Sequence, residues 1–521
     1  MNAPALPERP LARCRAAIAR RFGVDARALA ALRVSLGVLL LADLLLRSRD
    51  LVAFYADSGV LPRAVLREQF PAMAALSVHA LSGSAWVQGA LFLAAGGVAV
   101  ALLVGYRTRL AALVSFALLV SLHARNPVVL NGGDSLLRRL LFWGMFLPLG
   151  RRWSVDALRA ARERAADGRS PGSLSEEYER QPGNHVASVA TAALLIQVVV
   201  VYTANALFKL RGDRWVRGDA IQYVFSLDQL IVGFGDVLAR YPLVLGFFDR
   251  VWLGLLVSSV ALVLLTGRRR TVFASLFVGM HLGMALTMRL GIFPLVSIAG
   301  LIPFLPRAFW DRATAKLRAS EAWDRFDRED RRGRLDGLVS ERNRRGPAEA
   351  ARQIGRAKPP VVAGLLAFVL VWNAATLGYV AAPEEVESAV DPGEYRWDMF
   401  APEPRGADGW YVVPGRLEND TRRDVFHGTA VRWDRPPDVA DSYPNVRWFK
   451  YLMDLRVGAN EPLRPHLAEY LCRRWNASHG VGVERLGMYY VEQPTRLEGP
   501  EPTHRIELLR YACARQASVS E

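Results

Sequence analysis

The sequence of 521 residues predicts a polytopic α-helical membrane bundle of about nine spans, followed by a C-terminal extracytoplasmic α+β domain. Three observations predict this fold class. Hydrophobic residues make up 51% of the chain and are gathered into long runs. Basic residues are distributed unevenly over the segments that join these runs. After Ala381 the long apolar runs end, and short alternating segments typical of strands begin.

The apolar runs are candidate spans because a helix needs about 20 mostly apolar residues to cross the hydrocarbon core of a bilayer. The nine candidates are Ala28–Leu46, Ser84–Val104, Leu110–Leu122, Leu136–Leu149, Val186–Phe208, Val251–Thr266, Val272–Met288, Ile292–Phe309 and Val361–Ala381. The third and fourth are short, and Pro303 interrupts the eighth. No small-residue cleavage site follows the first run, so we expect no cleaved signal peptide there.

The net charge of +16 follows from the predicted topology. Residues 383–521 carry 18 Lys+Arg against 23 Asp+Glu, whereas the rest of the chain carries 48 against 27. With nine spans and a cytoplasmic N-terminus, the cytoplasmic segments hold 33 basic residues and the opposite loops hold 12. This asymmetry is the positive-inside pattern, which places the C-terminal domain outside the cytoplasm. Nucleic acid is not needed to explain the basic charge, and the bilayer is the expected partner.

These patterns divide the chain into five parts. They are a cytoplasmic arm (1–27), a membrane domain of eight spans (28–309), charged cytoplasmic helices (310–359), a ninth span (360–382) and the extracytoplasmic domain (383–521). In the last part we expect two strands joined by a turn at Asn419-Asp420, helices over Val446–Val457 and Leu463–Asn476, and two later strands. Cys472 and Cys513 both fall in this domain, where the compartment permits a disulfide; a bonded pair and two buried thiols are both consistent with the sequence.

Common enzyme signatures are absent from the sequence, including HExxH, CxxC and a phosphate-binding glycine loop, so no metal site is expected. The candidate chemistry lies in polar residues of the membrane domain. Lys209 ends the fifth apolar run. Its ammonium could extend to the outer interface as an anchor, which the spacing alone favours. Alternatively, the amine is withdrawn from water and acts as a general base.

Other polar residues extend this candidate site. His281 is about ten residues into the seventh run, so helix rise places it near the middle of the membrane. A histidine there is either bonded to a neighbouring helix or functional. The segment from His123 to Asp134 joins the third and fourth runs and contains the turn Asn131-Gly132-Gly133. Asn131 and Asp134 are consistent with a helix cap and an ion pair to Arg138, or with the polar floor of a pocket.

Four ordered stretches resemble the vitamin K-dependent gamma-carboxylase family and its bacterial relatives, which share a membrane domain named HTTM. They are Val201-Tyr202 with Phe208-Lys209-Leu210 and Trp215; Gly105-Tyr106-Arg107; His281 with Gly291-Ile292-Phe293; and Tyr395-Arg396-Trp397-Asp398-Met399. The chain differs from the carboxylase at Phe208, where that enzyme has a second lysine, and in its shorter outer portion.

The resemblance implies a protein of the bacterial inner membrane with a gamma-carboxylase-like, carbon–carbon lyase activity. Lys209 would deprotonate a reduced quinone, and reaction of the quinone with oxygen would drive carboxylation of glutamates in an exported peptide. The residues expected to line the pocket are His281, Asp134, Asn131, His123, Tyr202 and Trp215. The alternative is a non-enzymatic membrane protein that uses its outer domain to bind or mature an exported partner.

Overall fold

Six helices in the described part of the chain are long and apolar enough to cross a membrane. The computed structural model describes residues 8–166, 184–318, 348–381 and 397–513. The six are α2 (Ala26–Ser48), α6 (Ala85–Val104), α7 (Thr108–Arg125), α11 (Val189–Lys209), α17 (Gly267–Thr287) and residues Lys358–Thr376 of α21 (Ala348–Thr376). They are compatible with an integral membrane protein.

The other three expected spans take different forms. The eighth run becomes α18 (Phe293–Leu301) and the 3-10 helix η4 (Ile302–Phe304), bent by 108° from α19 (Arg307–Arg318); this pair would make a seventh span if it crosses as one unit. The prolines that flank the bend, Pro303 and Pro306, disfavour a continuous helix. The fourth and sixth runs form the shorter helices α8 (Gly132–Gly144), α15 (Pro242–Val257) and α16 (Ala261–Leu264).

The bundle has a buried interior and an apolar outer surface. Leu29, Leu32 and Leu36 of α2 are fully buried in the central core. On the outside, Leu93 of α6 is 79% exposed and Leu243 of α15 is 91% exposed. Large apolar side chains on the surface of such helices are suited to contact with lipid.

The C-terminal domain combines a five-stranded antiparallel sheet with two helices. Strand β6 (Val483–Pro494) is central: β3 (Ala407–Val412) and β4 (Pro414–Leu417) pair with it, and β7 (His504–Ala512) pairs with it as well. Strand β5 (Arg422–Asp424) pairs with β4 across the expected turn. The expected helices are α23 (Val446–Leu455) and α24 (Arg464–Ser478). A disulfide joins Cys472 of α24 to Cys513, just after β7.

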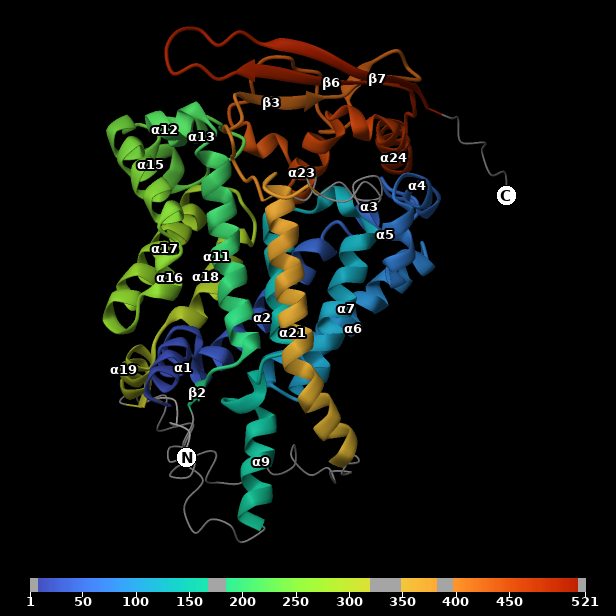
Figure 1. Ribbon diagram of the computed structural model, residues 1–521. Helices are drawn as coiled ribbons and strands as arrows, with labels where there is room; N and C mark the ends of the chain where they lie inside the picture. The colour runs from blue at the N-terminus through green and yellow to red at the C-terminus, as the bar shows by residue number, and fades with distance from the viewer. Residues whose placement is uncertain (1–7, 167–183, 319–347, 382–396, 514–521) are drawn as a thin grey trace, which may run out of the picture.

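Figure 1 places this domain at one end of the bundle, with α1 (Glu8–Phe22), α9 (Val155–Ala166) and α19 at the other end. Short helices lie between the spans, namely α3 (Leu51–Tyr55), α4 (Arg63–Gln69), α5 (Pro71–Leu76), α12 (Asp213–Arg217), α13 (Ala220–Phe225) and α14 (Phe234–Leu238), with the 3-10 turns η1 (Val78–Leu81), η2 (Pro127–Val129) and η3 (Leu149–Arg151). Two further 3-10 turns, η7 (Ala440–Ser442) and η8 (Gly458–Leu463), belong to the C-terminal domain. Strands β1 (Val24–Asp25) and β2 (His185–Val186) form a small antiparallel pair. Most of the charged segment expected over 310–359, and Tyr395-Arg396, lie outside the described residues.

Asp408 of β3 fastens the C-terminal domain to the loop between α13 and α14. We call this domain, residues 397–513, the outer domain because it lies at one end of the bundle. The Asp408 carboxylate accepts the backbone N–H groups of Asp228 at 3.0 Å and Gln229 at 3.2 Å, and the Arg435 guanidinium lies 3.6 Å away. Burial raises the pKa of Asp408 to about 6, and the nearby Asp228 carboxylate adds to this while the two N–H donors oppose it.

This pKa predicts that acidification favours the folded domain through Asp408. Because the folded pKa lies above the ordinary aspartate value, the folded state takes up a proton first as the pH falls. Between about pH 7 and about pH 4.5 the unfolding free energy of the wild type should rise by about 2 kcal/mol relative to Asp408→Asn. Thermal unfolding of both proteins at each pH measures the difference. The exposed Asp441→Asn should show no such divergence, and an equal divergence there would contradict the assignment.

Candidate functional site

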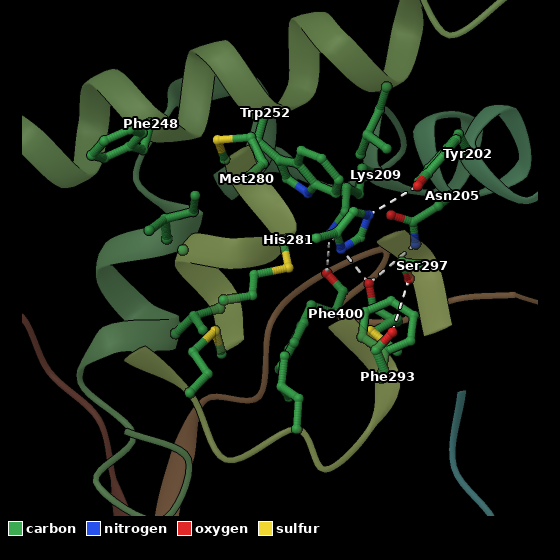
Figure 2. A pocket seen from close by; sticks show the side chains of 18 of the residues that line it. Tyr202, Asn205, Lys209, Phe248, Trp252, Met280, His281, Phe293, Ser297 and Phe400 are labelled. Atoms are coloured by element: carbon green, nitrogen blue, oxygen red, sulfur yellow. Dashed lines mark hydrogen bonds between the residues drawn. The ribbon is translucent and has the colours of Figure 1, made fainter. Parts of the chain in front are cut away.

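A largely apolar cavity of about 220 Å³ lies between α11, α15, α17 and α18 (Figure 2). Four of the residues expected in the pocket, Lys209, Tyr202, Trp215 and His281, line it. A dry apolar cavity of about 150 Å³ can hold a benzene-sized ring, so this space can admit a small ring system. Apolar walls with a few convergent polar groups are typical of small-molecule sites.

Lys209 is turned into the protein, so the interpretation of this residue as a surface anchor is wrong. Its side chain is 2% exposed. The Nζ atom donates to the carbonyl oxygens of Met399 and Phe400, each at 3.2 Å, and lies 3.2 Å from the centre of the Trp215 ring. In the described part of the chain Lys209 forms no ion pair with a carboxylate. Carbonyl dipoles and a ring face contact the amine directly, and the buried carboxylate of Asp249 acts on it from farther away.

The carbonyls come from a short segment that leads from the last span to the outer domain, and we call Trp397–Phe400 the strap. Asn205 donates to the Met399 carbonyl at 3.1 Å, and Trp215 Nε1 donates to the Phe400 carbonyl at 2.8 Å. Trp397, Met399 and Phe400 also line the cavity. Residues at the outer end of α11 and in α12 therefore hold the strap across the end of the cavity nearest the outer domain.

His281 and Tyr202 form the second polar feature of the cavity. The Tyr202 hydroxyl and His281 Nε2 are 2.9 Å apart, and both side chains are buried. The rings of Trp252 and Phe293 pack against His281, with centroid distances of 5.5 Å and 5.7 Å. His281 Nδ1 has no hydrogen-bond partner among the residues that the structure describes. A buried ring nitrogen without a partner is costly, so a polar ligand group opposite it would be stabilised.

Asn131, Asp134 and His123 do not line this cavity, which corrects the expectation that they do. Asn131 and Asp134 form a capping box at the start of α8, because each side chain accepts the other residue's backbone N–H. The Asp134 carboxylate is buried and accepts from Arg47 of α2 at 2.6 Å and from Arg447 of α23 at 3.0 Å. His123 Nε2 lies 3.1 Å from Arg47 Nη2.

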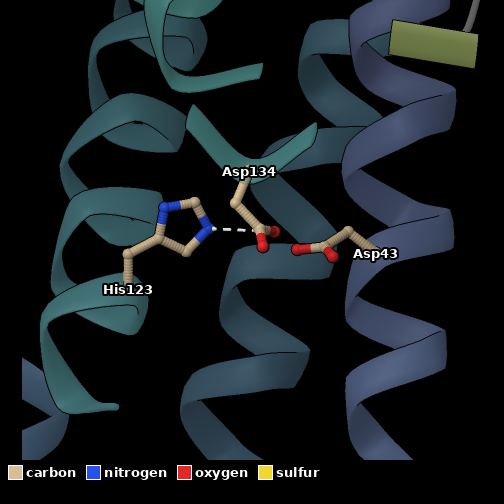
Figure 3. A group of neighbouring side chains, drawn as sticks. All are labelled: Asp43, His123 and Asp134. Carbon is tan, nitrogen blue, oxygen red and sulfur yellow. Dashed lines mark ion pairs between the residues drawn. The ribbon is translucent and has the colours of Figure 1, made fainter. Parts of the chain in front are cut away.

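Asp43, His123 and Asp134 lie close enough together to hold a metal ion (Figure 3). Arg47 and Arg447 argue against a metal ion here, because they already pair with both carboxylates. Arg47 contacts both carboxylates, at 2.7 Å and 2.6 Å, and Arg447 contacts them at 2.6 Å and 3.0 Å. Two positive guanidinium groups against two carboxylates already balance the charge. We therefore assign these residues, Asp43, Arg47, His123, Asp134 and Arg447, to a buried ion-pair cluster that joins the bundle to the outer domain.

The sequence contains part of the pattern that predicts the ion-pair cluster and part of the pattern that predicts the contacts of the strap. Asp43 and Arg47 stand four residues apart at the end of the first apolar run, a spacing that predicts an ion pair. Asn205 is a polar side chain inside the fifth run, where it needs a partner. No local pattern identifies Arg447 or the strap carbonyls, because their roles depend on contacts between segments about 190 to 400 residues apart.

No family model, no curated protein and no solved structure matches the chain.

Proposed function

We propose that the Lys209 cavity binds a reduced quinone and that the protein uses it in a quinol-dependent, gamma-carboxylase-like modification of exported peptides. The observation that carries this proposal is a lysine amine buried in an apolar, ring-sized cavity together with a histidine whose Nδ1 has no partner in the described part of the chain. A flat aromatic quinol with two hydroxyl groups suits both features. The order of motifs shared with the carboxylase family supports the same assignment.

The aromatic walls and polar groups of the cavity fit a quinol. Aromatic walls from Trp252 and Phe293 suit a flat ring. His281 Nδ1 can bond one ligand hydroxyl while Tyr202 fixes the other side of the imidazole. The Lys209 amine is the group that would take a hydroxyl proton at the opposite end. When bound, the quinol supplies, with oxygen, the base strength needed to remove a proton from a peptide glutamate.

A second candidate function is a non-enzymatic role, in which the outer domain binds or matures an exported partner. One observation favours it. The two strap carbonyls and the Trp215 ring offer one partner to each N–H of a protonated Lys209, which is the arrangement of a structural anchor. In this role the lysine fixes the outer domain on the bundle and performs no proton transfer.

Turnover by the purified protein separates the two functions. The wild type in lipid nanodiscs would be given a reduced naphthoquinone, oxygen, labelled bicarbonate and glutamate-rich peptides. The proposed function predicts quinol oxidation and label in the peptide. Absence of both quinol binding and quinol oxidation with a panel of quinols would overturn it. Specific retention of an exported protein by the same inactive preparation would then establish the binding role.

The orientation of the chain is part of this proposal, with nine crossings, a cytoplasmic N-terminus and an outer domain outside the cytoplasm of a bacterial inner membrane. The excess of basic residues on one side supports it. A reporter fused to the C-terminus should therefore be active if it works only in an oxidising, extracytoplasmic compartment. The same fusion with a reporter that works only in the cytoplasm should be inactive, and activity there would refute the orientation.

A further inference from the structure

We propose that the bundle holds an anionic phospholipid at the end opposite the outer domain, in a second cavity that is independent of the proposed function. This cavity has a volume of about 480 Å³ and is formed by residues 107–110, residues 148–151 and Asp156. Figure 1 places α9, which carries Asp156, at that end of the bundle. We call the cavity the basic pocket, because three of its residues are arginines.

Hydrogen bonds fix both turns that form the basic pocket. In the turn between α6 and α7, the Asp156 carboxylate accepts the backbone N–H groups of Arg107 at 2.9 Å and Thr108 at 2.8 Å. In the turn after α8, the buried guanidinium of Arg33 donates to the carbonyl of Arg152 at 3.1 Å. The pocket is therefore preformed, and the start of α7 balances much of the Asp156 charge.

The basic pocket presents guanidinium groups that have no carboxylate partner. Arg109 and Arg151 line it and are exposed, and neither guanidinium forms a hydrogen bond or an ion pair with any residue that the structure describes. Lys358, at the start of the apolar part of α21, is close enough to Arg109 for the two charges to repel. A bound anion would relieve this repulsion, and arginine suits phosphate because two of its N–H groups can bond two phosphate oxygens.

An apolar strip begins at the basic pocket and continues along α7. Leu110 lines the pocket and is 52% exposed, and Leu113 is also 52% exposed. These residues are three apart and so lie on the same face of the helix. Because α7 is long and apolar enough to cross a membrane, this face can contact an acyl chain while the arginines hold the headgroup. A soluble anion would leave the two leucines without a partner.

The charge of the basic pocket selects among phospholipids. Three arginines and one aspartate line it, so positive charge is in excess. A phosphatidylcholine headgroup carries a positive choline next to its phosphate, and the arginines and Lys358 would repel this group. An anionic headgroup such as that of phosphatidylglycerol has no such cation. Basic pockets between membrane helices are known sites for anionic headgroups.

Removal of two of the charges tests the site. The full chain in detergent is mixed with equal amounts of phosphatidylglycerol and phosphatidylcholine, and native mass spectrometry measures how much of each lipid is retained. The test variant is the double replacement Arg109→Gln, Arg151→Gln. The matched control is Arg268→Gln, Arg269→Gln, which removes the same charge from exposed arginines of α17 that do not line the basic pocket. All four residues are exposed, so both variants should unfold at nearly the wild-type temperature.

We expect the wild type and the control variant to retain phosphatidylglycerol in preference to phosphatidylcholine. The Arg109→Gln, Arg151→Gln variant should bind phosphatidylglycerol about tenfold more weakly. A wild type without this preference would overturn the site, as would equal retention of phosphatidylglycerol by the two double variants. Displacement of the lipid from the wild type by millimolar inorganic phosphate would also overturn it, since the occupant would then be a soluble anion.

Discussion

Replacement of Arg447 by alanine should lower the free energy of unfolding by about 3–5 kcal/mol, the largest stability effect expected in the outer domain. Arg447 bonds Asp43 at 2.6 Å and Asp134 at 3.0 Å, and both carboxylates are buried. Without this guanidinium, Arg47 alone would face two carboxylates, and one negative charge would remain buried without a partner. The measurement is thermal unfolding in detergent, together with limited proteolysis of the outer domain.

Arg432→Ala provides the control for this prediction, because Arg432 is an exposed arginine of the same domain. Its unfolding free energy should change by less than about 0.5 kcal/mol. The double variant Arg447→Leu, Asp134→Asn should recover part of the loss, since it removes one charge of each sign. An Arg447→Ala protein as stable as Arg432→Ala would show that the ion-pair cluster does not join the two domains.

Replacement of Lys209 by methionine should reduce quinol oxidation about 10²- to 10⁴-fold if the amine is a general base. Methionine is unbranched and apolar, so it can fill the space left by the buried lysine chain without adding an unpaired charge. The rate of quinol oxidation at saturating quinol is the decisive quantity, because loss of a base lowers turnover more than binding. Full activity in Lys209→Met would eliminate the catalytic role.

A loss of activity could also follow from release of the strap, and Asn205 distinguishes the two causes. Asn205→Leu removes the other hydrogen bond to the Met399 carbonyl but leaves the Lys209 amine in place. If Lys209 acts as a base, Asn205→Leu should keep most of the turnover that Lys209→Met loses. Equal losses in both variants would assign Lys209 to anchoring of the strap.

The sequence predicted the helical bundle and the strand-containing domain because both depend on local patterns. Apolar runs of about 20 residues and strict alternation are properties of neighbouring residues. Runs such as Leu136–Leu149 were harder to interpret, since a run of 14 residues forms either a span or a buried helix. The structure has the short helix α8 here, with its N-terminus capped by Asn131.

The candidate site was predictable only in part. Tyr202, Lys209 and Trp215 are near one another in the chain, and His281 joins them across two packed helices. Asp134 was expected beside them as part of the polar floor of a pocket between helices. Depth alone does not determine which side of a bundle a residue faces. The guanidinium of Arg447, which comes from a distant part of the chain, pairs with Asp134 in a different cluster.

The strap connects ligand binding at Lys209 with the attachment of the outer domain to the bundle. Met399 and Phe400 bond Lys209 through their carbonyls, and only six residues separate Phe400 from the start of β3 at Ala407. Any ligand that competes for the Lys209 amine must weaken the attachment of the outer domain. By thermodynamic reciprocity, any partner that displaces the outer domain must alter ligand affinity by the same factor. Occupancy of the Lys209 cavity and the position of the outer domain are therefore linked variables, and measurement of either one reports on the other.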